Sequence, residues 1–598
     1  MVKELPLRNE LDERFKWDVQ AIYQTEQGWE DDFQQVESQL QQVTDFQGKL
    51  AESADNLLAG LELIMEIQQV VSRLYVYAHL RKDENTLEQK YQAIYDRAQQ
   101  LSNQVSSVTS FMVPEILTLT DEKVNDYIKT NQRLELYRHL LANILRQKDH
   151  YLSAEEERIL AMVGDVTQGP ANIFSMLNNA DLVFPTIKDG SGEEIRVTHG
   201  RYINLMQSNE RRVRKDAFQA LYSKYNDYIN TFATTLSTNI KSHVFYARAR
   251  NYDSALEAAL DDDNIPLQVY NNLISTVKDN LDPMYRYIAL RKKILGLDQL
   301  RMYDIYAPLV KEIEMKIPFN EAKEIICKGL KPLGDEYISN LKEGFDSGWI
   351  DVYENKGKRS GAYSSGCYGV HPYVLLNYTD NLDNLFTLAH EMGHALHTFY
   401  ANNNQPFVYS NYKIFVAEVA STLNETLLNN YLLENTDDKA KQRYLINHYL
   451  EQFRGTVFRQ TMFAEFEKII HEEVEKGIPL TPENLKEKYR QLNQIYYGPD
   501  IVLDQQIELE WARIPHFYYN FYVYKYATGF SAATALANKI MEDGTESLTK
   551  YLDFLKSGDK DYPINLLKKA GVDMTDPTPI EEAIGTFREY VDRLEELS

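Results

Sequence analysis

The chain has 598 residues, of which 43% are hydrophobic and 26% are charged, and its formal net charge is −25. A chain of this length can bury a large core and can form two lobes. The acidic balance excludes a nucleic-acid partner, because no basic excess is present to neutralise phosphates, and no apolar run is long enough for a membrane helix.

Two cysteines, Cys327 and Cys367, occur far apart and without metal-binding spacing. We therefore expect no disulfide framework, and we expect the protein to occupy a reducing compartment. The first ten residues lack the basic, then apolar, then small-residue order of a secretory signal. We expect a soluble, cytoplasmic protein with no membrane partner.

Residues 1–200 are expected to form an N-terminal helical lobe, and residues 201–598 a second lobe that carries the chemical motifs. The first lobe has long segments of helical periodicity rich in Glu, Gln, Leu and Lys. The exception is 181–198, where two extended runs flank the turn residues 188–192. This pattern predicts a β-hairpin.

A glycine-containing stretch, 361–378, precedes the main motif. Glycine lets a backbone approach a ligand closely, and an edge strand can pair with an extended peptide through main-chain hydrogen bonds. We expect a small β-sheet here and a substrate-binding wall formed by Gly361, Gly366, Gly369, His371 and Tyr373. The alternative is an ordinary strand and turn in a small sheet.

The central motif, His390-Glu391-Met392-Gly393-His394, is an HExxH pattern. Apolar residues recur at helical spacing across 382–399, and both histidines lie off this apolar stripe. Histidines at i and i+4 lie about 40° apart around a helix, so His390 and His394 can bind one zinc ion while Glu391 acts on water. The alternative is a pair of structural histidines.

A catalytic zinc site needs a third ligand. His397 is seven residues from His390, a rise of about 10.5 Å, so it cannot share one ion with both motif histidines. The segment 415–428 has helical periodicity and places Glu418 and Glu425 on one face. Glu418 is the predicted third ligand and Glu425 the predicted acceptor that orients a ligand histidine. For either glutamate, the alternative is a solvated helix face.

A histidine followed by five tyrosines marks the segment 513–531. The chain has 42 tyrosines, so a packed aromatic core is the simpler explanation for most of those in this segment. The residue pattern alone does not select one of them for chemistry.

Taken together, these stretches resemble the thimet-oligopeptidase-like zinc metallopeptidases and, within them, oligoendopeptidase F. The combination is specific because it includes HEMGH, the following Phe-Val-Ala-Glu-Val-Ala-Ser and matching stretches at 249–256, 304–309, 361–370, 516–531 and 566–574. The resemblance implies a mainly α, two-lobed metallopeptidase with a deep cleft, a small β-sheet next to the zinc helix, and one zinc ion per chain. It also implies that the N-terminal lobe forms a wall of the substrate channel.

The resemblance implies roles for the tyrosine-rich segment as well. In the family, a histidine and a tyrosine of this segment face the zinc and donate hydrogen bonds to the oxyanion. His516 matches the histidine. Counting back from Phe530, Tyr524 matches the tyrosine and Tyr522 the position just before it, with Tyr519 as an alternative.

The expected function is zinc-dependent hydrolysis of internal bonds in short, unstructured peptides, with Glu391 as general base. Oligopeptides are the expected partners, and the protein is expected to be a monomer or a small homo-oligomer. Two alternatives remain open: a zinc carboxypeptidase or dipeptidase on a related helical fold, and a non-catalytic peptide-binding or scaffold protein. Cleavage of an end-blocked peptide separates the first from an endopeptidase, and the second predicts neither products nor stoichiometric metal.

Overall fold

The computed structural model describes residues 4–310 and 315–598. Helices dominate this part of the chain, and none of its strands exceeds three residues. The predicted mainly α fold is therefore confirmed. No helix among the described residues combines the length and the apolar character needed to span a bilayer.

The chain forms two compact units, and each is assembled from three separate stretches. Unit 1 contains 1–151, 314–431 and 536–571, and unit 2 contains 152–313, 432–535 and 572–598. The predicted division at residue 200 does not coincide with these units, because residue 200 lies inside unit 2. The boundaries fall where periodicity gives no signal, two of them within continuous helices.

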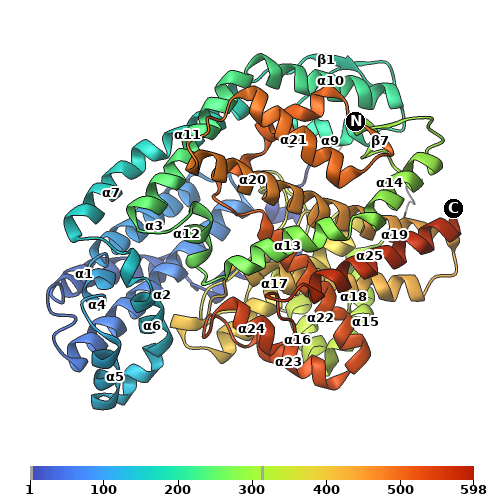
Figure 1. Cartoon of the computed structure of the whole chain (residues 1–598). Helices are drawn as coiled ribbons and strands as arrows, with labels where there is room; N and C mark the ends of the chain where they lie inside the picture. The colour runs from blue at the N-terminus through green and yellow to red at the C-terminus, as the bar shows by residue number, and fades with distance from the viewer. Residues whose placement is uncertain (1–3, 311–314) are drawn as a thin grey trace. The chain divides into compact units, whose positions relative to one another are not determined.

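Unit 1 begins with helices that pack on one another at the start of the chain, α1 with α2 and α3 (Figure 1). Its helices are α1 (Glu26–Thr44), α2 (Ala54–Glu84), α3 (Gln89–Val108), α4 (Met112–Ile116), α5 (Asp121–Thr130), α6 (Arg138–Arg146), α15 (Phe319–Gly329), α16 (Gly334–Asp346), α17 (Leu382–Asn404), most of α18 (Ile414–Glu434), α23 (Thr545–Leu555) and α24 (Pro563–Lys569).

Unit 2 is likewise helical. Its helices are α7 (Ala154–Thr167), α8 (Gly169–Met176), α9 (His199–Met206), α10 (Arg211–Asp227), α11 (Ile229–Ala249), α12 (Ala255–Asp261), α13 (Leu267–Asp279), α14 (Asp282–Ile294), α19 (Lys439–Phe453), α20 (Arg459–Glu475), α21 (Pro482–Tyr497), the first part of α22 (Tyr524–Asp543) and α25 (Thr578–Leu597).

The strands form three small sheets. Strands β1 (Thr186–Lys188) and β2 (Glu194–Arg196) pair antiparallel, which confirms the predicted hairpin. Strands β3 (Leu300–Arg301) and β7 (Ile501–Val502) pair in parallel. The third sheet has the order β4-β6-β5, built from β4 (Ile350–Asp351), β5 (Tyr363–Ser365) and β6 (Tyr373–Leu375). Helix α17 packs on β5 and β6, so the predicted sheet does lie beside the motif helix.

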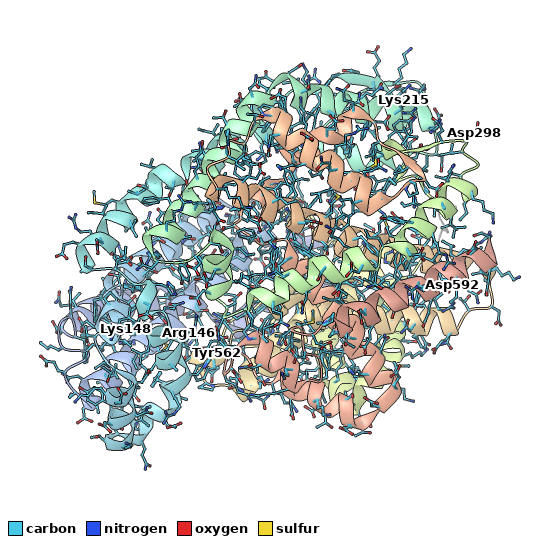
Figure 2. The ribbon with its side chains drawn as sticks, in the orientation of Figure 1. Arg146, Lys148, Lys215, Asp298, Tyr562 and Asp592 are labelled. Carbon is cyan, nitrogen blue, oxygen red and sulfur yellow. The ribbon has the colours of Figure 1, made fainter. Side chains whose placement is uncertain are left out.

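Unit 1 is held together by contacts between distant stretches. A continuous apolar core runs from Trp17 through the first helices to Tyr373 in β6. At another point the guanidinium of Arg146 lies 5.8 Å from the ring centroid of Tyr562, and both side chains are labelled in Figure 2. The sheet therefore rests on the same core as the N-terminal helices, and α17 packs on the sheet.

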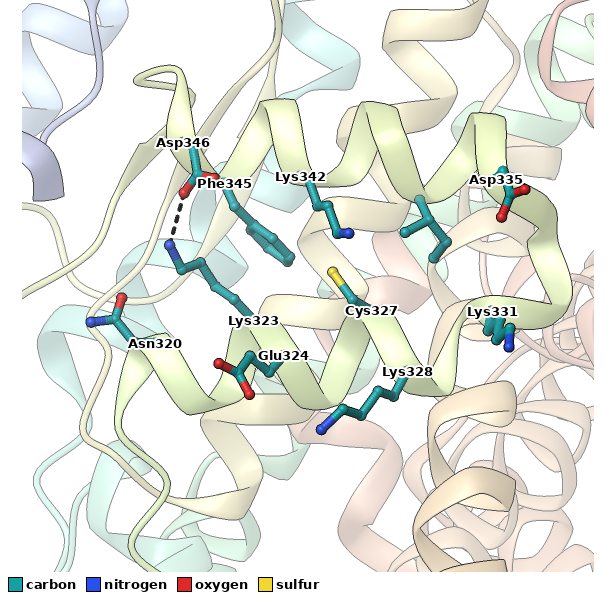
Figure 3. Close-up of a pocket in the computed structure, with 11 residues that line it drawn as sticks. Asn320, Lys323, Glu324, Cys327, Lys328, Lys331, Asp335, Lys342, Phe345 and Asp346 are labelled. Carbon is teal, nitrogen blue, oxygen red and sulfur yellow. Dashed lines mark hydrogen bonds and ion pairs between the residues drawn. The ribbon is translucent and has the colours of Figure 1, made fainter.

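A lysine-rich groove of about 680 Å³ lies between α15 and α16 (Figure 3). Lys323 on one wall forms an ion pair of 2.8 Å with Asp346, and the half-buried Cys327 lies between the walls. Its lining includes none of the predicted metal ligands.

Candidate active site

Helix α17 carries the HExxH motif, and local sequence features explain where the helix begins and which face it buries. Asn381 caps it by accepting a hydrogen bond of 2.8 Å from the backbone N–H of Asn384. Leu385, Met392 and Leu396 of its apolar stripe are fully buried. Burying that stripe turns the two motif histidines to a different side, as the periodicity predicted.

Three side chains converge with the chemistry of a zinc site. The Nε2 atoms of His390 and His394 lie 3.6 and 3.7 Å from Oε2 of Glu418. Ligand atoms bound at zinc distances in a tetrahedron are separated by about 3.4 Å, so the spacing of His390, His394 and Glu418 fits a shared ion. Among the described residues these three form the group of His, Cys, Asp and Glu side chains that could hold a metal.

Glu425 fixes the ring of His390. Its Oε1 accepts a hydrogen bond of 2.6 Å from Nδ1 of His390, which leaves the lone pair of Nε2 directed toward Glu418. Burial alone would lower the pKa of His390, but the hydrogen bond and charge of Glu425 outweigh it and raise this pKa to about 9. The carboxylate of Glu425 therefore makes His390 a more basic ligand.

The two ligand-bearing helices approach each other closely at a glycine. A Cβ atom built on Gly393 would lie 2.6 Å from the Cα of Ser421 and 2.8 Å from the carbonyl oxygen of Ala420. Nearby, the side-chain amide of Asn424 donates a 3.0 Å hydrogen bond to the carbonyl oxygen of Ala389. The helices α17 and α18 are thus fixed at a separation that brings Glu418 to the histidines.

Glu391 lies beside the ligands in a nearly closed environment, with 8% of its surface exposed. Burial raises its pKa to about 7; the positive charge of His390 opposes this shift, and the negative charges of Glu418 and Glu425 add to it. A carboxyl group with a pKa near neutrality can both accept and return a proton.

The third histidine of α17 is not a ligand. His397 is buried, and its ring stacks on Tyr412 with a centroid distance of 3.7 Å. Its sequence distance from His390 excluded it only as a ligand of the same ion, and its side chain packs in the interior.

The glycines of the predicted substrate-binding wall differ in their surroundings. A Cβ on Gly366 would lie 2.9 Å from Cγ2 of Thr398 on α17, so glycine permits the loop to lie against the motif helix. Gly361 and Gly369 have φ values of +88° and +81° and open space around them. These two positions require glycine for backbone conformation and not for space.

The side chains of His371 and Tyr373 face the interior of unit 1. The ring of His371 is parallel to Trp349 at a centroid distance of 5.8 Å. Tyr373 has 0% of its surface exposed, and its hydroxyl donates to the carbonyl oxygen of Asp18. The two rings also contact each other, with centroids 4.5 Å apart.

In unit 2, the tyrosine-rich segment presents one aromatic face. The ring of His516 lies 5.6–6.0 Å from the rings of Tyr519, Tyr522 and Tyr526, and the ring of Tyr522 lies 5.4 Å from Tyr526 and 6.4 Å from Tyr519. We call this set of four residues the His516 face. The hydroxyl of Tyr526 is 3.3 Å from Nε2 of His516. Burial lowers the pKa of His516, and Arg459 adds to the effect.

The structure places the candidate tyrosines in different surroundings. Tyr524, which the resemblance favoured, has 1% of its surface exposed, and its ring packs at 5.0 Å from that of Tyr270. Tyr522 keeps a place beside His516, and Tyr526, which the sequence comparison did not select, joins it. Sequence spacing alone does not predict that Tyr526 lies beside His516. Between them, Asn520 and Phe521 form a turn with positive φ values, and this turn determines which side chains come together.

Comparison with known proteins identifies the family of the chain. Residues 204–586 match peptidase family M3, and residues 115–184 match the Oligopeptidase F family. Oligopeptidase PepF of Bacillus subtilis is 50% identical over 594 residues, covering 99% of this chain and 89% of the relative. An oligoendopeptidase F homolog of Lactococcus lactis is 44% identical, covering 99% of this chain and 98% of the relative.

Solved structures give the same result. The crystal structure of oligoendopeptidase-F from Enterococcus faecium is 42% identical, with a TM-score of 0.76 over 96% of this chain and 99% of that one. A peptidase structure from Chlamydophila abortus is 38% identical, with a TM-score of 0.93 over the full length of both chains. The chain therefore belongs to peptidase family M3, among the oligoendopeptidase F proteins, and is a peptidase.

Proposed function

We propose that this peptidase is a zinc-dependent oligoendopeptidase that cleaves internal bonds of short, unstructured peptides. The observation that carries the proposal is the convergence of His390, His394 and Glu418, with Glu391 buried beside them. Two imidazoles and one carboxylate form a ligand set typical of catalytic zinc and leave a position for water and substrate.

Glu391 is the proposed general base. His390, His394 and Glu418 would hold the zinc ion, which would supply Lewis acidity toward the scissile carbonyl and the attacking water. Glu391 accepts the proton of the attacking water and returns it to the departing amine. No covalent link between the chain and the substrate is needed.

The His516 face is the proposed source of oxyanion stabilisation. Its imidazole and the adjacent hydroxyl of Tyr526 are hydrogen-bond donors held close together, with Tyr522 on the same face. Donors of this kind act where negative charge develops on the carbonyl oxygen.

The edge of β5 is the proposed binding surface for the peptide backbone. This strand is the last in the order β4-β6-β5, and glycines 361, 366 and 369 flank it. Main-chain pairing would explain cleavage of many sequences, because it does not depend on substrate side chains. His371 and Tyr373 contribute by holding the sheet.

The test is digestion of a peptide blocked at both ends, followed by mass spectrometry, with metal analysis of the same sample. We expect one zinc ion per chain, internal cleavage by the wild type and loss of cleavage on chelation. Glu391→Gln is expected to fold, to retain zinc and to cleave at a rate near background, since an amide cannot accept the proton. Cleavage by Glu391→Gln at the wild-type rate would falsify the assignment of the base.

Other outcomes select the alternatives. Trimming of a free peptide without cleavage of the blocked one indicates a zinc exopeptidase. Absence of both metal and products indicates a peptide-binding protein. The two cysteines are free, which suits a reducing compartment, and a cytoplasmic location stays a prediction.

A further inference from the structure

A left-handed turn interrupts the His516 face. Asn520 and Phe521 have φ values of +47° and +59°, and neither is a glycine. Two consecutive side-chain-bearing residues in this region are unusual, and a bulky residue such as phenylalanine occupies it only when its surroundings impose it. The turn lies between Tyr519 and Tyr522, so it determines how the second half of the face meets the first.

A buried acid holds this turn. The backbone N–H of Phe521 donates a hydrogen bond of 2.7 Å to Oε1 of Glu467, on α20. Glu467 has 0% of its surface exposed. Burial raises its pKa to about 8, and the N–H of Phe521 opposes that shift. Burying a carboxyl group without a basic partner costs folding free energy. Here the hydrogen-bond partner of that carboxyl group is the backbone N–H of Phe521.

Two buried histidines, His471 and His243, lie next to Phe521 and Glu467. The ring of His471 lies 4.3 Å from that of Phe521, and its Nδ1 donates to the carbonyl oxygen of Glu467. Its Nε2 must therefore accept, and Nδ1 of His243 donates to it at 3.1 Å. Both rings are buried, and burial lowers the pKa of each. The pair is neutral and has one fixed orientation.

The other side of the turn is also packed. The ring of Tyr270 lies 5.8 Å from Phe521 and 5.0 Å from Tyr524, and its hydroxyl donates to the carbonyl oxygen of Ala464 on α20. Phe521 is thus enclosed by α13 and α20, while Tyr519, on the preceding side of the turn, is 56% exposed. Within the turn, Phe521 is buried and Asn520 is half-buried, and Tyr522 after it is half-buried.

We propose that Glu467 is a positioning residue for the His516 face, because its hydrogen bond to Phe521 holds the left-handed turn that keeps Tyr522 and Tyr526 beside His516. This inference rests on the proposed role of that face in stabilising the oxyanion. Glu467 touches neither substrate nor metal; it acts through the backbone of Phe521.

The direct test is amide hydrogen exchange, which does not depend on peptidase activity. In the wild type, the Phe521 amide is expected to exchange as slowly as the amides inside α20. Glu467→Leu removes the acceptor while keeping a similar volume, and exchange across 517–523 should become faster. Glu467→Gln retains an acceptor oxygen and should restore protection.

The kinetic test separates positioning from general stability. For Glu467→Leu we expect kcat, per zinc-containing folded chain, to fall about 100-fold, the scale of a displacement of about 1 Å in a catalytic group. KM and zinc content should not change, since an interaction made only in the transition state is lost. Glu467→Gln should recover most of kcat.

The matched control is Glu465→Gln. Glu465 is a buried acid on the same helix, but its carboxylate accepts from Tyr496 at 2.9 Å and pairs with Lys278 at 2.6 Å, away from the turn. This variant should lower thermal stability without changing kcat or exchange across 517–523.

The outcomes are distinct. Faster exchange with an unchanged kcat, or unchanged exchange in Glu467→Leu, overturns the proposal. If Glu467→Leu does not fold, the exchange rate of the Phe521 amide in the wild type tests the proposal. Exchange at the rate of exposed backbone overturns the proposal. Slow exchange of this amide, together with peptidase activity in Glu467→Gln, supports the proposal. A wild type without peptidase activity refutes the proposed function, and the exchange measurement still reports whether Glu467 holds the turn.

Discussion

At the scale of single residues, Glu425 shows how an acidic side chain outside the predicted ligand set can orient a ligand histidine. Its hydrogen bond to Nδ1 of His390 fixes both the ring and the tautomer of a ligand. We expect Glu425→Leu to weaken zinc binding about 10-fold to 100-fold, the usual effect of removing such a partner.

Competition with a chromogenic chelator measures that affinity. The control is Glu434→Gln, an exposed acid near the end of the same helix, which should leave zinc binding unchanged. Equal zinc affinity in Glu425→Leu and the wild type would show that the hydrogen bond does not support the ligand.

The residue scale also shows where sequence reasoning stops. His390, His394, Glu418 and Glu425 could be placed together because helical spacing fixes which side chains share a face. The tyrosine could not be chosen that way, since the left-handed pair at 520–521 changes the spacing on either side of it. Asparagine enters this conformation more readily than most residues, but phenylalanine gives no such signal.

At the scale of elements, the site depends on the contact between α17 and α18 at Gly393. A methyl group here would meet the backbone of Ser421 and Ala420, which cannot rotate away as a side chain can. We expect Gly393→Ala to cost about 1–3 kcal/mol, as overpacking does, and to weaken zinc binding because Glu418 moves with α18.

Thermal unfolding of the metal-free protein and zinc titration measure the two effects separately. Gly585→Ala is the matched control: it lies within α25, and its Cβ would meet nothing within 4 Å. Alanine there should raise stability by up to about 1 kcal/mol through helix propensity. A Gly393→Ala variant with undiminished stability and zinc affinity would mean that the helices can separate without cost.

The sequence predicted individual helices and strands better than it predicted which elements pack together. The hairpin at 181–198 and the helix from 382 follow from local patterns, turn residues in the first case and an apolar stripe in the second. The pairing of α17 with α18 through a glycine has no periodic signature, since it depends on what a missing side chain allows.

At the scale of the whole molecule, the chain visits each unit three times, and no composition shift marks the crossings. Two boundaries fall within α18 and α22, where helical periodicity continues without a break. A division read from sequence in contiguous blocks could not find units of this kind. The metal ligands belong to unit 1 and the His516 face to unit 2.

That distribution gives a prediction that separates turnover from zinc binding. If the hydroxyl of Tyr526 stabilises the oxyanion, Tyr526→Phe should lower kcat by about 100-fold to 1,000-fold while zinc affinity stays the same, because the ligands lie in the other unit. Tyr522→Phe and Tyr524→Phe, measured in parallel, identify which hydroxyl acts. We expect the largest loss at Tyr526, whose oxygen is 3.3 Å from His516.

Tyr518→Phe is the control for loss of a buried hydroxyl in the same segment. Its hydroxyl lies 2.9 Å from that of Thr235 in the interior of unit 2, so its removal should affect stability but not turnover. A loss of kcat confined to Tyr524→Phe would contradict the assignment, because the hydroxyl would then act from a position that the packing against Tyr270 closes. A loss of zinc in Tyr526→Phe would contradict the independence of the two sets of residues.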